Sequence, residues 1–172
     1  MKRILPLIIS FFVLGTAFAQ KDPAAKPKIY HPEADAKADI KTTVETASKE
    51  GKHVLLMIGG NWCSWCLRFN DKVNTNDTLK TALEKNYILY HLNYSKENFN
   101  EEALASLGYP QRFGFPVFVI LDGKGNRIHT QNSAYLEQGK GYSTTQIVDF
   151  FNQWSPAAID PKTYAKKEEK KN

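Results

Sequence analysis

The feature that most constrains the fold of this chain is an unbroken apolar run that leads into a pair of cysteines. Residues 53–58 read HVLLMI and are closed by two glycines. An apolar run of this length, without polar alternation, is typical of a central strand that is buried on both faces. The segment WCSWC follows at residues 62–66, and we expect a helix to begin within it and to continue to about Val73. The sequence therefore predicts a buried strand that delivers two cysteines to the start of a helix.

These cysteines, Cys63 and Cys66, are the only two in the chain. A structural disulfide stabilises a protein mainly by closing a loop, and a bridge across two intervening residues closes almost none. At a helix N-terminus, unpaired N–H groups and the helix dipole stabilise a thiolate on Cys63. A spacing of three places Cys66 one turn later on the same face, within bonding reach. The pair is poorly placed as a stabilising cross-link and well placed for thiol–disulfide exchange.

The remaining segments alternate between helical and strand patterns. Helices are expected at residues 33–50, from Asn76 or Asp77, after a cap at Asn100, and after a cap at Ser143 until Pro156. Strands are expected at 87–93, 117–121 and 127 to about 131, the last two joined by the turn DGKGN. Alternating strands and helices favour parallel pairing, whereas the tight turn adds an antiparallel pair. The sequence predicts an α/β fold with a mixed central β-sheet and helices on both faces.

Both ends of the chain have the composition of segments that lie outside a core. Residues 1–19 are interpreted as a secretory signal peptide, with two basic residues, an apolar stretch and an AFA cleavage pattern. Residues 20–32 contain three prolines and are expected to form a flexible lead-in. The folded domain is then expected at 33–156, and 157–172 is expected to be a polar, solvated tail. The mature protein is expected to be periplasmic or secreted, where disulfides are permitted, with no stable membrane insertion after cleavage.

On these residues the chain resembles the thioredoxin superfamily over about residues 36–154. Trp62 precedes the first cysteine, as in many members, and the motif lies between an apolar strand and a helix. Gly114-Phe115-Pro116 stands before the strand at 117–121, where the family carries a cis-proline packed against its disulfide. The resemblance implies a thioredoxin fold.

The resemblance also implies roles for the site residues. Cys63 would be the nucleophile and Cys66 the resolving thiol. A groove for substrate peptides would be shaped by Phe115 and Pro116, with Trp62 beside it. Trp65, between the cysteines, either contacts the substrate or merely covers the surface of the first helical turn. We favour contact, because a residue at that position has little core available to it.

The chain departs from thioredoxin itself at the residues that serve proton transfer. Met57 stands on the strand where thioredoxin has a buried aspartate, so that proton relay does not carry over. His91 falls near the expected site and has two interpretations. It either eases proton transfer to Cys66, so that the turnover rate would change with pH near ~6.5 as the histidine ionises, or it is an ordinary strand histidine. We favour the ordinary histidine.

The function predicted from these features is that of an exported thiol–disulfide oxidoreductase acting on protein substrates that bear thiols or disulfides. The reductive direction is favoured because Ser64-Trp65 lacks the histidine of strong oxidants and the chain has no long insertion. A second redox protein would donate or accept the electrons, and no cofactor is expected. One alternative is a binding or chaperone module with a non-catalytic disulfide. A thiol peroxidase is disfavoured, since Gly60 occupies the position where it would need threonine or serine.

Other classes of site are disfavoured by the same sequence. The four histidines are scattered without the spacing of zinc ligands. No basic stripe with interleaved aromatic residues is present, so nucleic acid is not an expected partner.

Overall fold

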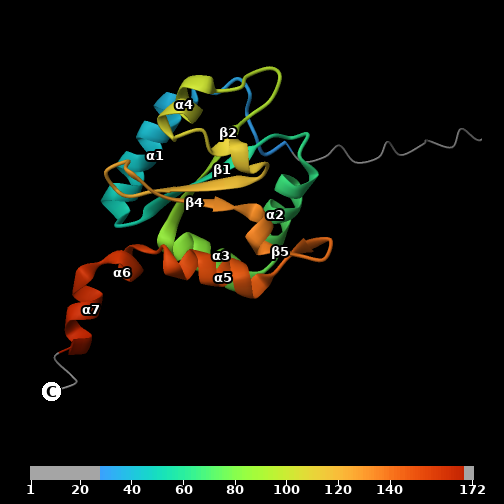
Figure 1. Ribbon diagram of the computed structural model, residues 1–172. Coiled ribbons are helices and arrows are strands. Elements are labelled where there is room, and N and C mark those ends of the chain that lie inside the picture. The colour runs from blue at the N-terminus through green and yellow to red at the C-terminus, as the bar shows by residue number, and fades with distance from the viewer. Residues whose placement is uncertain (1–27, 169–172) are drawn as a thin grey trace, which may run out of the picture.

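A four-stranded mixed sheet forms the centre of the molecule (Figure 1), whose computed structural model describes residues 28–168. The strands are β1 (His53–Gly59), β2 (Tyr87–Asn93), β3 (Val117–Leu121) and β4 (Arg127–Asn132), arranged in the order β2-β1-β3-β4. β1 pairs in parallel with β2 and antiparallel with β3, and β3 pairs antiparallel with β4. The predicted mixed sheet is confirmed.

Helices cover both faces of this sheet, as predicted. Figure 1 shows α1 (Ala36–Glu50) and α4 (Glu101–Ser106) on one side, and α3 (Asp77–Asn86) and α5 (Thr144–Gln153) on the other. α2 (Ser64–Asn74) shares a core with α3 and α5. The smaller elements are two 3-10 turns at Pro110–Phe113 and Ser133–Leu136 and the hairpin strands β5 (Glu137–Gln138) and β6 (Gly141–Tyr142).

β1 and β3 are buried throughout because their side chains alternate between two cores. Leu55 and Met57 face the core under α2, α3 and α5, together with Phe118 and Ile120 from β3. The alternate residues face the core under α1 and α4: Val54, Leu56, Ile58, Val117, Val119 and Leu121. The unbroken apolar run of the sequence is the consequence of this two-sided burial.

Side-chain caps explain where three of the helices begin. The Asp35 carboxylate accepts the N–H groups of Lys37 and Ala38, and Asn76 and Ser143 cap α3 and α5 in the same way. Asn100 is the N-cap residue of α4, as predicted, but its side chain makes no capping hydrogen bond. Asn100 has a φ of 49°, and its side-chain amide donates to the carbonyl of Asn93. The Asn100 side chain therefore anchors the loop after β2 and is not used to cap the helix.

The C-terminal end of the described chain forms two further short helices. α5 ends at Gln153, and Pro156 begins a further short helix, α6 (Pro156–Ile159), because proline is tolerated in the first turn of a helix. α7 (Pro161–Glu168) follows and extends away from the sheet (Figure 1), and its residues 161–165 are exposed, which agrees with the expected solvated tail. The predicted signal peptide at 1–19 and residues 20–27 of the lead-in lie outside the described residues.

We predict that Tyr87→Phe lowers the free energy of unfolding by about 1–3 kcal/mol, because the buried Tyr87 hydroxyl donates to the carbonyl of Phe151 at 2.7 Å and ties β2 to α5. Chemical denaturation measures the change. Tyr135→Phe is the matched control, since Tyr135 is 74% exposed and should tolerate the loss of its hydroxyl. Equal stability of the Tyr87→Phe variant and the unaltered protein would contradict the role given to this hydrogen bond.

Candidate active site

The two cysteines form a disulfide at the first turn of α2. Cys63 is the N-cap residue of this helix, with extended backbone angles, and its Sγ accepts the N–H of Cys66 at 3.1 Å. The Cys66 side chain is completely buried, whereas Cys63 retains 5% exposure. Cys63 is therefore the less buried residue of the pair. The sequence predicted both the helix start and the pairing of these thiols.

The charges around this helix start favour a thiolate on Cys63. The first turn of α2, which lies within Ser64–Asn74, holds no acidic residue. The helix dipole and the Cys66 N–H both point their positive ends at the Cys63 sulfur. Among the buried residues that the structure describes, none is an aspartate or glutamate. Negative charge on the sulfur is thus stabilised by the backbone, and no buried carboxylate among the described residues repels it.

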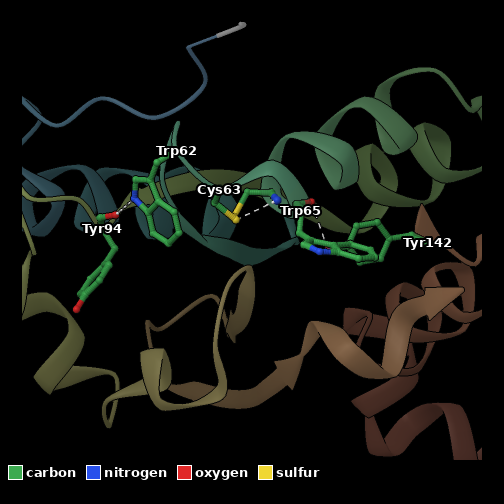
Figure 2. The surroundings of a disulfide bond; sticks show 6 residues. Trp62, Cys63, Trp65, Tyr94 and Tyr142 are labelled. Carbon is green, nitrogen blue, oxygen red and sulfur yellow. Dashed lines mark hydrogen bonds between the residues drawn. A yellow bond between two sulfur atoms is a disulfide. The ribbon is translucent and has the colours of Figure 1, made fainter. Parts of the chain in front are cut away.

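One aromatic group lies on the Trp62 side of the disulfide (Figure 2). The Trp62 side chain is 58% exposed, and its Nε1 donates to the carbonyl of Tyr94 at 2.8 Å. Phe115 packs edge-on against Trp62 and stacks on Tyr94, with centroids 5.4 and 4.8 Å apart. The Phe115–Pro116 bond is cis, the isomer that the family resemblance implied. Pro116 is buried and directly precedes Val117, which pairs with Ile58 near the end of β1.

A second aromatic group lies on the Trp65 side. Trp65 and Tyr142 meet edge-on with centroids 5.5 Å apart, and the Tyr142 hydroxyl lies 3.3 Å from the Trp65 carbonyl, to which it donates. The Arg68 guanidinium lies 5.1 Å from the centroid of the Trp65 ring. Figure 2 shows Cys63 between the two groups. Sequence reasoning did not identify Tyr94 or Tyr142, because each approaches the cysteines only through the folding of distant segments.

The N-terminal segment also belongs to the site, which corrects the expectation of a flexible lead-in for residues 28–32. Tyr30 is 1% exposed and shares a core with Cys63 and Cys66. Asn61 holds it in place: Oδ1 accepts the N–H groups of Ile29 and Tyr30, and Nδ2 donates to the Tyr30 carbonyl. The sequence carried no local signal for this contact, because Asn61 lies 31 residues further along the chain than Tyr30.

His91 is packed against Tyr30. The two rings meet edge-on with centroids 5.4 Å apart, and His91 pairs with Met57 in the register of β1 and β2. Burial, with a smaller contribution from the charge of His31, lowers the pKa of His91 to about 4. A change of turnover rate near pH ~6.5 would require His91 to ionise there. With a pKa of about 4, His91 is already neutral at that pH, so the suggested dependence does not fit.

The described part of the chain contains no cluster of three or more histidine, cysteine, aspartate or glutamate side chains that could hold a metal ion. None of its helices is long and apolar enough to cross a membrane.

Comparisons with known proteins agree with this architecture. Residues 35–123 match the model of a family described as thioredoxin-like. A disulphide isomerase from Xylella fastidiosa Temecula1 is 26% identical, with a TM-score of 0.65, over 75% of this chain and 98% of that chain. A thioredoxin-fold protein from Helicobacter pylori is 20% identical, with a TM-score of 0.47, over 72% and 91% of the two chains. No curated protein matches the sequence. The family match and the similarity to the Xylella protein confirm the expected thioredoxin fold.

We predict that Asn61→Ala releases the Tyr30 segment from the site. The loss of three hydrogen bonds should lower the free energy of unfolding by about 1–3 kcal/mol and should speed hydrogen exchange at the amides of Ile29 and Tyr30. Asn74→Ala is the control, because the exposed Asn74 side chain bonds only within its own helix. Unchanged exchange at both amides would show that Asn61 does not hold this segment.

We also predict that His91 makes the protein less stable in acid. A folded-state pKa of about 4 lies below the ordinary ~6.5, so the unfolded chain binds a proton first as the pH falls. The free energy of unfolding should therefore decrease between about pH 6.5 and pH 4, with up to about 1.4 kcal/mol per pH unit from this residue.

Denaturation at a series of pH values measures that slope. His91→Gln should flatten it, and His31→Gln, on an exposed side chain, should leave most of it in place. An identical slope for the His91→Gln variant and the unaltered protein would contradict the assignment.

Proposed function

This chain belongs to the thioredoxin-like family, and we propose that it is an exported thiol–disulfide oxidoreductase that reduces disulfides in protein substrates. The observation that carries the proposal is the Cys63–Cys66 disulfide at the start of α2, where the less buried sulfur accepts a backbone N–H. The similarity to a disulphide isomerase at 26% identity supports thiol–disulfide chemistry on proteins.

The reduced protein would act through two successive exchanges. The Cys63 thiolate attacks a substrate disulfide, so that a bond forms between the Cys63 sulfur and one substrate sulfur while the substrate bond breaks. The released substrate thiolate takes up a proton. The Cys66 thiol then loses its proton and attacks the Cys63 sulfur, which releases the second substrate thiol and leaves the Cys63–Cys66 disulfide. Two electrons pass to the substrate, and the structure corresponds to the oxidised product.

The direction and the compartment are supported by the sequence. The Ser64-Trp65 pair lacks the histidine that favours strong oxidants, and no long insertion interrupts the fold. The signal-like residues 1–19 support export to a compartment that permits disulfides. A separate redox protein would then return the two electrons to the pair.

The exposed Trp62 and the half-buried Trp65 and Phe115 around the disulfide would receive the substrate. Trp62 presents most of its indole to solvent, beside Phe115 and the cis bond to Pro116. Trp65 offers a second aromatic face on the opposite side of Cys63 (Figure 2). An extended peptide that crosses the disulfide would contact both groups, and aromatic side chains contribute large contact areas at protein interfaces.

The proposal predicts that Cys66→Ser accumulates mixed disulfides with protein substrates, because Cys63 can attack but the resolving thiol is missing. Cys63→Ser should trap none, and a variant with both substitutions is the blank. Gel analysis without reductant, followed by recovery of substrate on reduction, measures the adducts. Trapping by Cys63→Ser alone would reverse the two roles.

Insulin reduction with dithiothreitol tests the activity itself. The unaltered protein should accelerate precipitation of the reduced insulin chains, and both single variants should lose that acceleration. A rate equal to the background for the unaltered protein would contradict the proposal and favour a binding or chaperone module with a non-catalytic disulfide. A substrate with wrongly paired disulfides provides a further test. If the protein reactivates it without consuming reductant, the activity is disulfide isomerisation and not reduction.

A further inference from the structure

The Tyr30 hydroxyl is a buried polar group with nothing to bond in the oxidised protein. No hydrogen-bond partner for it lies among described residues 28–168, and the hydroxyl oxygen is inaccessible to solvent. Asn61 holds the backbone N–H and carbonyl of Tyr30, and the Tyr30 side chain is buried in the core. An unpaired buried hydroxyl is costly, and such groups are rare in folded proteins. This one needs a physical reason.

Gly59 shows what the hydroxyl faces. A Cβ built on Gly59 would collide with the Cys66 Sγ and would lie 2.9 Å from the Tyr30 hydroxyl. The sulfur and the hydroxyl therefore flank the same small space beside the glycine. This space exists because residue 59, the last of β1, carries no side chain. The unpaired hydroxyl and the resolving cysteine are neighbours across it.

No buried acidic side chain among the described residues could interact with the Cys66 sulfur in place of the Tyr30 hydroxyl. Met57, which precedes Gly59 on the same face of β1, is fully buried and apolar. No buried aspartate or glutamate exists among the described residues. Burial also raises the pKa of Tyr30 well above its usual range, so the hydroxyl keeps its proton at neutral pH and can only donate it in a hydrogen bond.

We propose that the Tyr30 hydroxyl donates a hydrogen bond to the Cys66 sulfur when the disulfide is reduced, and that it thereby stabilises the dithiol form. This inference rests on the proposed redox function. A disulfide sulfur is a weak acceptor, whereas a thiolate is a strong one, and a thiol can accept through its lone pairs. The hydroxyl is therefore unpaired in one redox state and paired in the other. Tyr30 acts here as a positioning residue for the resolving thiol.

The proposal has a thermodynamic consequence. A group that is satisfied only in the reduced state shifts the equilibrium of the pair towards the dithiol. Removing the hydroxyl relieves the unpaired group in the disulfide form and deletes a hydrogen bond in the dithiol form. Both changes favour the disulfide. We expect Tyr30→Phe to move the equilibrium with glutathione about tenfold towards the disulfide, which corresponds to a potential about 30 mV more negative.

The full-length mature protein is equilibrated with glutathione buffers of graded ratio, and the reduced fraction is measured after acid quenching and thiol alkylation. Tyr87→Phe is the matched control, since it also removes a buried tyrosine hydroxyl, but one that donates to Phe151. It should leave the equilibrium within twofold of the unaltered protein. An equilibrium for Tyr30→Phe within twofold of the unaltered protein, a shift towards the dithiol, or an equal shift in Tyr87→Phe would each overturn the proposal.

Unfolding of the two redox forms separates this effect from a loss of packing. Tyr30→Phe should raise the unfolding equilibrium constant of the reduced protein tenfold relative to that of the oxidised protein. A purely structural role would change the two constants equally. The test is independent of enzymatic turnover. If insulin reduction fails while the equilibrium still shifts, the proposed function falls and the role of Tyr30 stands. If insulin is reduced and the equilibrium does not shift, the proposed function stands and the role of Tyr30 falls.

Discussion

The architecture of the site depends on one residue that serves two purposes, because Cys63 is both the N-cap of α2 and the less buried cysteine of the disulfide. A helix N-terminus needs an acceptor for its unpaired N–H groups, and here the acceptor is the Cys63 Sγ bonded to the N–H of Cys66. A serine or aspartate in the same position would cap the helix with oxygen and have no redox chemistry. The helix start therefore orients the sulfur and stabilises negative charge on it at the same time.

The sheet determines what surrounds that sulfur. β1 lies between β2 and β3, so the end of β1 brings the cysteine helix next to residues from both neighbouring strands. Val117 pairs with Ile58, which places Phe115 and its cis bond to Pro116 at the edge of the site. His91 pairs with Met57 on the other side and packs against Tyr30. The glycine at the end of β1 leaves the space that the Cys66 sulfur and the Tyr30 hydroxyl flank.

Sequence reasoning succeeded where local pattern determines structure. The strands at 87–93 and 117–121 were predicted with the bounds that the structure has, because each apolar run is bounded by helix-ending or turn residues. It failed where the decisive contact is distant. Tyr30 was assigned to a flexible lead-in because the composition of residues 20–32 gives no sign of its bond to Asn61. The low pKa of His91 follows from its burial in the folded protein, and so it could not be anticipated either. Local pattern also missed the use of the Asn100 side chain, whose amide bonds the Asn93 carbonyl.

The central claim is that the start of α2 activates Cys63, and titration of the thiolate by ultraviolet absorbance in the reduced protein tests it most directly. The account predicts one thiol with a pKa at least about one unit below the ordinary value of about 8.5. That low-pH transition should persist in Cys66→Ser, which retains the backbone N–H, and should vanish in Cys63→Ser. Titration of both thiols at or above about pH 8.5 would contradict the account, because the helix start would then give the sulfur no advantage as a nucleophile.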